Sequence, residues 1–233
     1  MGEIISARAP VGQIVADTES ALSNATALGG QYKSLAEMYI GPVIGALTST
    51  KTKLAPIEQA LNAVNGDILA LNNASDDLIQ EEADYLWNKL GRPGSDPYYD
   101  LIFPGGTGIY VDAKPEHQPA KMYLLCELLE SGVHPKLDPT IANACAQRIR
   151  SQADAFQAKI DMMLPLRNKH ELLTAVWESV GRSARGRLLA LKRAYLAAGI
   201  SEADIHQVIP DRPSQRSKPK ASEEPAKPEG EPK

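Results

Sequence analysis

The side chains most suited to chemistry in this chain are histidines and cysteines, and their spacing does not assemble a reactive centre. The histidines are His117, His134, His170 and His206. None belongs to an HExxH pattern or stands four residues from another histidine, the spacing that places two metal ligands on one helical face. Glu130 and His134 have helical i, i+4 spacing, but Gly132 is expected to end the helix between them. We therefore favour surface histidines over a metal site.

The two cysteines, Cys126 and Cys145, are too far apart for a CxxC pair and too few for a disulfide framework. We interpret both as small buried apolar residues in a reducing compartment. The chain has no Gly-x-Ser-x-Gly nucleophile elbow, and neither cysteine has a histidine at a recognisable spacing. The expectation is a protein that is not an enzyme, with no catalytic residues, no metal site and no cofactor.

A glycine-rich segment, Phe103 to Gly108, suggests phosphate binding because bare backbone amides can hold anions. It lacks the Lys-Ser/Thr pair of a P-loop and the spacing of a dinucleotide fingerprint, so a tight turn is favoured. Leu101 to Phe103 and Ile109 to Val111 on either side could form short strands. The segment lies in a Gly/Pro-rich connector, residues 91–119, which we expect to be ordered because it concentrates aromatic residues. These aromatic residues are Tyr98, Tyr99, Phe103 and Tyr110.

The net charge of −4 argues against a general nucleic-acid binder, but the charges are unevenly distributed. Residues 1–119 carry 7 basic and 15 acidic residues, whereas residues 120–209 carry 12 and 9. Two blocks could dock on one another, within one subunit or between neighbours, although a solvated or salt-bridged face is the more ordinary interpretation. The candidate acidic face comprises Asp76, Asp77, Glu81, Glu82 and Asp84, and the candidate basic face comprises Arg182, Arg185, Lys192 and Arg193.

The strongest structural pattern is an alternation of three- and four-residue steps between apolar positions, which predicts a coiled-coil helix from about Thr52 to Leu90. Two positions of this pattern are polar, Ser75 and Glu82, which is compatible with a role in setting register. We predict that the apolar positions form a self-association face. Its residues are Leu54, Ile57, Leu61, Val64, Ile68, Leu71, Leu78 and Tyr85.

An uncharged, glycine-containing stretch, Tyr39 to Thr50, precedes this helix. Gly41 and Pro42 predict a kink there. We expect the chain to turn within Thr48 to Lys53, which is rich in threonine and lysine, so that residues 12–90 form a helical hairpin. The stretch is then either kinked core or an apolar tip that contacts lipid or a protein partner. The tip residues are Tyr39, Ile40, Val43, Ile44 and Leu47.

The remaining elements are also helical. A short helix from about Pro119 to Ser131 is followed by Asp138-Pro139, an N-cap with proline at the first helical position. Pro165 is expected to end or kink the helix that begins there, giving a second hairpin over residues 138–199 within the helical region 120–209. Ser201 and Asp204 have the spacing of a capping arrangement. Residues 210–233, rich in Pro, Lys and Glu, are predicted to be disordered.

Taken together, these features predict an all-α fold, an elongated bundle of two long helical hairpins that resembles a coiled coil, with a connector and a disordered tail. The segment 1–11 shows no signal-peptide pattern, and no apolar run reaches the length of a membrane span, so a cytoplasmic protein is expected. We predict a non-enzymatic structural or adaptor protein that self-associates, as a homo-oligomer, or binds a protein partner. The alternatives are a membrane-active protein with an apolar tip and, less favoured, nucleic-acid binding through the basic face.

Overall fold

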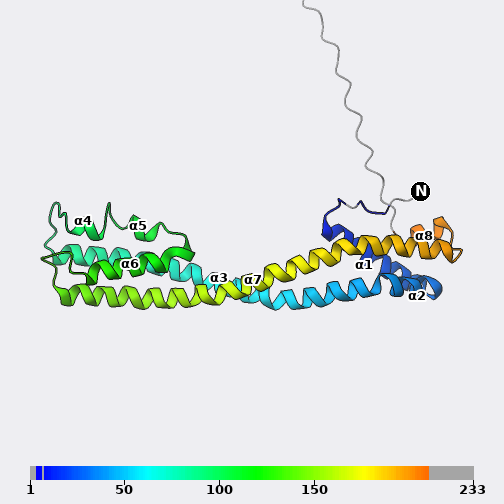
Figure 1. Cartoon of the computed structure of the whole chain (residues 1–233), viewed down its shortest axis with the longest axis horizontal. Coiled ribbons are helices and arrows are strands. Elements are labelled where there is room, and N and C mark those ends of the chain that lie inside the picture. The colour runs from blue at the N-terminus through cyan, green and yellow to red at the C-terminus, as the bar shows by residue number, and fades with distance from the viewer. Residues whose placement is uncertain (1–3, 7, 210–233) are drawn as a thin grey trace, which may run out of the picture. The chain divides into compact units, whose positions relative to one another are not determined.

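The computed structural model describes residues 4–6 and 8–209, and every regular element in these residues is a helix. The predicted all-α class is therefore confirmed (Figure 1). The helices are α1 (Val11–Leu28), α2 (Gly30–Tyr39), α3 (Gly41–Lys89), α4 (Tyr99–Ile102), α5 (Gly108–Val111), a 3₁₀ helix (Pro115–His117), α6 (Gln118–Glu130), α7 (Pro139–Ala197) and α8 (Glu202–Val208). The predicted disordered tail, residues 210–233, lies outside the described residues.

The predicted starts of two helices are confirmed by their capping contacts. Asp138 precedes α7, and its carboxylate accepts a hydrogen bond from the backbone amide of Thr140 at 2.7 Å. Ser201 precedes α8, and its hydroxyl accepts one from the amide of Asp204 at 3.2 Å. Each side chain satisfies an amide in the first helical turn that has no partner inside the helix.

The predicted turn at Thr48 to Lys53 is wrong, because α3 continues through these residues without interruption. The threonines are accommodated: the hydroxyl of Thr50 donates to the carbonyl oxygen of Ala46 one turn earlier, at 2.9 Å. A hydrogen bond from a threonine hydroxyl to the carbonyl four residues earlier satisfies the hydroxyl inside a helix, just as a contact in a turn would. The chain instead breaks at Gly29, where φ is +73°, and at Ile40, just before Pro42 in the first turn of α3.

Two further predictions about local structure are corrected. Pro165 lies inside α7, which runs as one helix of 59 residues rather than as a hairpin. Leu101 and Ile102 lie in the short helix α4, which ends just before Phe103, and Ile109 to Val111 lie in α5, so neither segment forms a strand. The glycines between them do form a tight turn, in which the amide of Gly106 donates to the carbonyl of Phe103 at 3.0 Å.

The chain divides into two compact units whose limits differ from the predicted segments. Unit 1 comprises Met1–Thr50 and Val176–Lys233, and unit 2 comprises Lys51–Ala175. Both long helices, α3 and α7, supply residues to both units. The helical pattern of the sequence continues across these limits, which is why periodicity did not reveal them.

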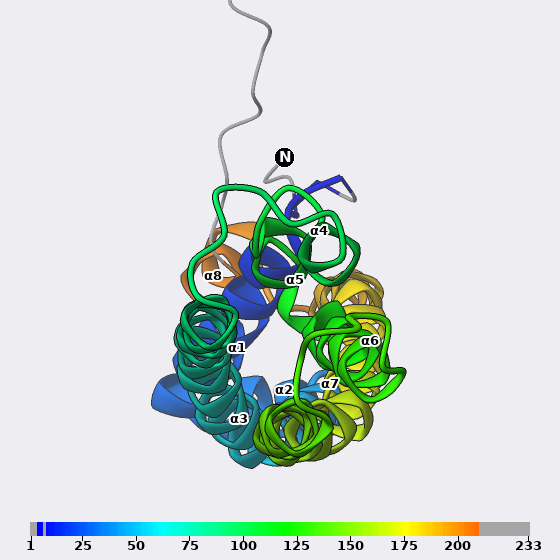
Figure 2. The same ribbon diagram turned by 90° about the vertical axis from the view of Figure 1, so that its left-hand side faces the viewer.

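Unit 2 is built on α3, α6 and α7, which share one apolar core, with α4 and α5 covering one side (Figure 2). The core takes Ile79 and Leu86 from α3, Met122 from α6, and Ile149 and Phe156 from α7, and none of these side chains is more than 1% exposed. Each contributes about 1.5–3 kcal/mol relative to an exposed position. The connector belongs to this core because Phe103 and Tyr110 are buried in it.

Unit 1 packs α1, α2 and α8 against the first turns of α3 and the last turns of α7. Polar contacts join these elements. The hydroxyl of Tyr195 donates to the backbone carbonyl of Tyr32 at 2.8 Å, and the side-chain amide of Asn24 donates to the backbone carbonyl of Val208 at 3.1 Å. At Gly181, α7 passes close to α1, since an added Cβ would lie 2.4 Å from a methyl group of Val11.

This contact gives a prediction with a control in the same helix. Gly181→Ala is expected to destabilise unit 1 by about 1 kcal/mol, because overpacking costs about 1–3 kcal/mol and exceeds the gain of about 1 kcal/mol in helix propensity. Gly186→Ala, where a Cβ would meet nothing within 4 Å, is expected to stabilise by up to about 1 kcal/mol. Thermal and denaturant unfolding measure both changes.

A compensating substitution tests the cause. Adding Val11→Ala to Gly181→Ala removes the methyl group that the new Cβ would meet, so the cost of the alanine should fall in that background. Equal effects of alanine at positions 181 and 186 would contradict the close contact between α1 and α7.

Candidate interaction surfaces

Four polar contacts join α3 to α7 in unit 2 and define one antiparallel register. In each contact the two residue numbers add up to between 226 and 230. A nearly constant total is expected when two antiparallel helices advance by the same rise per residue. The helices therefore run side by side without a slip over this length. The pairs are Glu82 with Arg148, Ser75 with Gln152, Asp67 with Lys159, and Glu58 with His170.

The predicted self-association face lies largely inside this pairing. Val64 and Ile68 belong to the core of unit 2, and Leu61, Leu71 and Leu78 pack against it. Of the remaining residues of this face, Ile57 is buried, Leu54 is half-buried and Tyr85 is exposed. The polar positions Ser75 and Glu82 also pair within the chain, so the register that they set is that of α3 on α7. Self-association itself stays a prediction, but most of this face is covered by the chain.

Glu82 is the most buried charged residue in these polar contacts. Its side chain is 6% exposed, whereas that of Arg148 is 49% exposed, and the guanidinium donates through two nitrogens to the two carboxylate oxygens. Burial by itself would raise the pKa of Glu82, but hydrogen bonds from Arg148 and Cys145, together with the charge of Arg148, outweigh burial and lower it. The carboxylate is therefore held ionised by its partner on α7.

The other residues of the candidate acidic face divide into two groups. Asp76 accepts hydrogen bonds from the side-chain amides of Asn72 and Gln118, at 3.0 and 3.2 Å. Burial raises its pKa, as do the nearby charges of Asp77 and Asp112. The exposed acidic residues on this part of α3 are Asp77, Glu81 and Asp84.

The candidate basic face on α7 is also divided. Arg185 donates to the backbone carbonyl of Ile5 at 2.7 Å, and the ammonium of Lys192 lies 3.2 Å from a carboxylate oxygen of Glu202. These two residues make contacts within unit 1. The other arginines of the segment are exposed, and their side chains make no hydrogen bond or ion pair within residues 4–6 and 8–209. They are Arg182, Arg187 and Arg193.

The five residues of the predicted apolar tip lie in the cores of unit 1. Ile40 is fully buried in one core cluster, and Val43 and Leu47 are buried in a second. Tyr39 and Ile44 are partly buried against the first cluster. The kinked-core interpretation therefore holds, and these side chains are not presented as a tip. Among the described helices, none is long and apolar enough to span a membrane.

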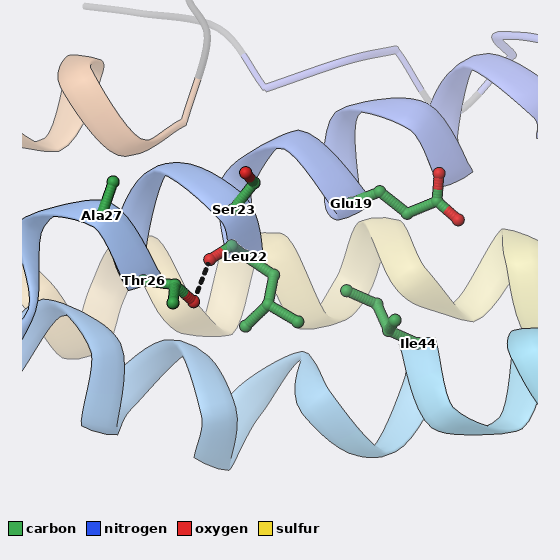
Figure 3. Close-up of a pocket in the computed structure, with 6 residues that line it drawn as sticks. All are labelled: Glu19, Leu22, Ser23, Thr26, Ala27 and Ile44. Atoms are coloured by element: carbon green, nitrogen blue, oxygen red, sulfur yellow. Dashed lines mark hydrogen bonds between the residues drawn. The ribbon is translucent and has the colours of Figure 1, made fainter.

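Sequence reasoning missed an open groove of about 490 Å³ in unit 1, between α1 and the start of α3 (Figure 3). Leu22 and Ile44 supply its apolar side chains, and Glu19 lies at one end. The hydroxyl of Thr26 is satisfied by the carbonyl of Leu22 at 2.7 Å. The one signal for this groove in the sequence is the row of small residues on α1, since Ser23, Thr26 and Ala27 leave space beside the helix.

His134 was predicted to lie at the surface, and this is wrong: it is 3% exposed. Its Nδ1 accepts from the backbone amide of Lys136 at 3.2 Å, so the proton is on Nε2, which donates to Asp96 at 3.1 Å. Asp96 also accepts from the amides of Tyr98 and Tyr99, so the pair anchors the connector. No three His, Cys, Asp or Glu side chains gather as a metal site in the described part of the chain.

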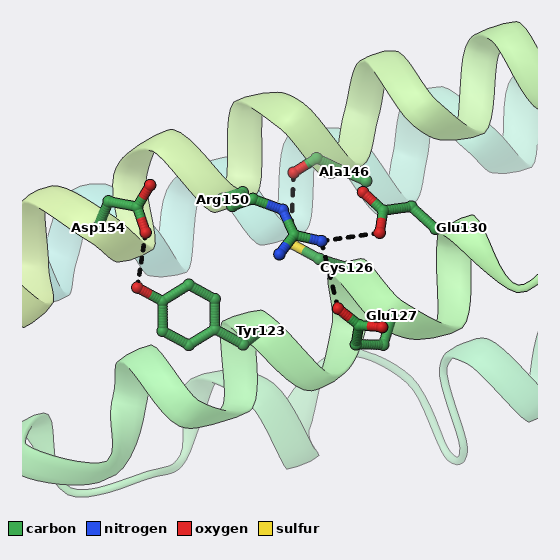
Figure 4. Close-up of polar contacts among 7 residues, drawn as sticks. All are labelled: Tyr123, Cys126, Glu127, Glu130, Ala146, Arg150 and Asp154. Carbon is green, nitrogen blue, oxygen red and sulfur yellow. Dashed lines mark hydrogen bonds and ion pairs between the residues drawn. The ribbon is translucent and has the colours of Figure 1, made fainter.

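Both cysteine thiols are buried where helices pack together, and Figure 4 shows Cys126. Cys126 on α6 donates to the carbonyl of Ala146 on α7, and burial raises its pKa to about 11. Burial and a hydrogen bond to Glu82 raise the pKa of Cys145 to about 12. Thiols with such pKa values stay protonated at neutral pH and are poor nucleophiles. Around Cys126, Arg150 bridges Glu127 and Glu130, and Tyr123 donates to Asp154.

Comparison with known proteins places no further constraint on these surfaces. No protein-family model, no curated protein and no solved structure matches this chain. The function of the surfaces has to be inferred from their contacts, burial and charge.

The Glu82–Arg148 pair predicts a pH dependence of stability. Because the pKa of Glu82 is lowered from 4.5 by folding, its ionised form contributes stability above that pH, and the contribution is lost as the pH falls through the folded-state pKa. The difference in unfolding free energy between wild type and Glu82→Gln should be constant near neutral pH and shrink below about pH 4.5. Denaturant unfolding over the acidic range measures it.

Removing the other partner tests the same pair. Arg148→Met leaves a buried carboxylate without its cation and is expected to cost about 2–3 kcal/mol at pH 7, somewhat below the usual range because the arginine is half exposed. Gln157→Met, which removes an exposed contact with Asp161 on the same helix, is the matched control and should change stability by less than about 0.5 kcal/mol. Equal costs would contradict the role assigned to Arg148.

Proposed function

We propose that this chain is a non-enzymatic structural or adaptor protein that binds a protein, another copy of itself or a different partner, through exposed helical faces. The observation that carries the proposal is a pair of exposed charged surfaces of opposite sign, one in each unit. Arg182, Arg187 and Arg193 are exposed on α7 in unit 1 without a partner in the described residues. Asp77, Glu81 and Asp84 are exposed on α3 in unit 2.

The spacing of these charges supports a docking role. Asp77, Glu81 and Asp84 stand at i, i+4 and i+7, so their carboxylates lie on one face of α3. Arg182 and Arg193 are eleven residues apart, three helical turns, and lie on one face of α7. Two helices with such rows can align opposite charges over several contacts, which steers encounter and orientation more than it adds affinity.

The charge of the two units supports docking between copies. Unit 2 has 12 basic and 17 acidic residues, whereas the residues assigned to unit 1 have 13 basic and 12 acidic. Unit 2 is therefore acidic while unit 1 is close to neutral, so docking between copies would depend on the local rows of exposed charge, which have opposite signs. Such head-to-tail contacts close into rings or extend into chains, depending on the rotation between copies.

The non-enzymatic part of the proposal is supported by the state of the side chains best suited to catalysis. His134 is buried with both ring nitrogens hydrogen bonded. Cys126 and Cys145 are buried with raised pKa values. These groups contribute to packing and to loop anchoring, which leaves surface recognition as the favoured role.

A cytoplasmic location belongs to the same proposal. Its support is that both cysteines are free thiols, which persist in a reducing compartment.

The membrane-active alternative loses its support because Ile40, Val43 and Leu47 are buried. Nucleic-acid binding keeps one supporting observation, the exposed arginines of α7, whose guanidinium groups are suited to phosphate.

Charge reversal and salt test the docking of the two charged surfaces. Wild type is expected to associate through these charged surfaces at low salt, and this contribution to association should be lost at about 1 M NaCl, where charges are screened beyond about 3 Å. Arg182→Glu/Arg193→Glu and Asp77→Lys/Asp84→Lys should each weaken self-association by about tenfold or more, since each exposed pair contributes about 0.2–1 kcal/mol and reversal adds repulsion. Light scattering after size exclusion measures the mass.

Mixing provides the decisive control. The two reversed variants should associate with each other through the charged surfaces, because the opposite signs are restored across the contact, while each variant alone should lack this charge-dependent association. Lys33→Glu, a similarly exposed cation of unit 1, should behave as wild type. Failure of the mixture to associate would contradict docking between these surfaces. Duplex DNA binding that disappears with Arg182→Glu/Arg193→Glu would favour the nucleic-acid alternative instead.

A further inference from the structure

A second heptad pattern, which the sequence analysis did not single out, runs along an exposed side of α7 in unit 2. The residues succeed one another in steps of four, three, four and three, which places them on one helical face. All five are exposed, Met162 by 53% and Leu172 by 65% of their surfaces. We name this set the α7 seam: Ala158, Met162, Pro165, Lys169 and Leu172.

The α7 seam is distinct from the side of α7 that packs in unit 2. The core residues there include Phe156, Ile160 and Met163, which are buried. Met162 and Leu172 belong neither to that core nor to the partly buried residues packed against it. Lys169 makes no hydrogen bond or ion pair in the part of the chain that the structure describes. Within those residues, nothing covers the seam.

We propose that the α7 seam pairs with the α7 seam of a second copy, in antiparallel orientation. This inference rests on the proposed function and names one surface through which the chain self-associates. An interface between identical surfaces is closed by a twofold axis, so it produces a dimer rather than a chain of copies.

The pairing matches large side chains with large ones. In the antiparallel register that brings seam residues opposite one another, Met162 of one copy faces Leu172 of the other, and Pro165 faces Lys169. Each dimer therefore has two Met–Leu layers around a narrower centre. Burial of these methionine and leucine side chains supplies the apolar driving force for pairing. The interface is short, so we expect a dissociation constant in roughly the micromolar range.

Lys169 determines the orientation. In a parallel pair in register, the two Lys169 side chains would face each other and repel. In the antiparallel pair, Lys169 lies opposite Pro165 and one helical turn, about 6 Å, from the level of Asp161 in the other copy. The lysine stem can cover the compact proline ring while its ammonium approaches that carboxylate. Charge complementarity therefore favours a second, antiparallel copy as the occupant.

The tail of the chain is a poorer occupant of the seam. Residues 210–233 contain no Leu, Ile, Val, Met or aromatic residue. They could not supply large aliphatic or aromatic side chains to cover Met162 and Leu172. An association that depends on this tail would be a different interaction and would not require the seam.

Sedimentation velocity of the full chain over a wide concentration range tests the proposal. Wild type should dimerise at low salt and also at about 1 M NaCl, because apolar burial is not screened. Leu172→Glu and Met162→Glu should each raise the dissociation constant by about tenfold or more. Leu101→Glu, at a position of α4 that is 56% exposed in the same unit, should leave dimerisation unchanged. These positions are exposed, so folding should be retained, which circular dichroism verifies.

Disulfide cross-linking tests the register. Met162→Cys/Leu172→Cys should form disulfide-linked dimers on mild oxidation, because the two positions face each other across the antiparallel pair. Met162→Cys alone should remain uncross-linked. The native Cys126 and Cys145 are buried and contribute little background. Efficient cross-linking of Met162→Cys alone would overturn the antiparallel arrangement.

The outcomes separate this inference from the proposed function. A dimer that survives high salt and is lost in Leu172→Glu supports the seam. If Leu172→Glu associates as strongly as wild type while Arg182→Glu/Arg193→Glu does not, the seam is overturned and the proposed charge docking stands. Wild type that is monomeric at every concentration at low and at high salt overturns the seam and self-association together.

Discussion

The pairing of α3 with α7 is the interaction on which the rest of unit 2 depends. Its register is held where the apolar pattern of α3 is interrupted, since Glu82 meets Arg148 and Ser75 meets Gln152. A slip of one turn would leave the Glu82 carboxylate buried without a cation, which is far more costly than shifting one apolar contact. With the register set, α6 adds Met122 and Leu125 to the same core. The connector contributes Phe103 and Tyr110 to it.

This pairing also determines which surfaces remain for partners. The apolar face of α3 packs largely within the chain, so an outer association has to use residues that point away from the core. Those are the charged rows on α3 and α7 and the α7 seam with Met162 and Leu172. A charged row and an apolar seam respond oppositely to salt, which makes the two modes of association physically separable.

Side chains that often carry chemistry serve to anchor loops in this molecule. Asp96 accepts from two backbone amides and from His134, and the hydroxyl of Tyr99 donates to the carbonyl of Ala83 on α3 at 2.9 Å. A connector so rich in glycine and proline has a large conformational entropy to lose on folding. Buried aromatic rings and hydrogen-bonded polar groups offset that loss, which explains why Phe103 and Tyr110 are buried.

The sequence by itself determined the helical class and many helix ends, because capping and periodicity act over a few neighbouring residues. Asp138 and Ser201 are capping residues whatever the helices later pack against. Only the tertiary structure decided that the chain continues through Thr48 to Lys53, since threonine hydroxyls are satisfied equally in a turn or by back-bonding in a helix. It also decided that the heptad residues of α3 lie against α7 and that Ile40 is core. A periodic apolar face specifies burial but not its partner, and that choice depends on contacts between residues far apart in the chain.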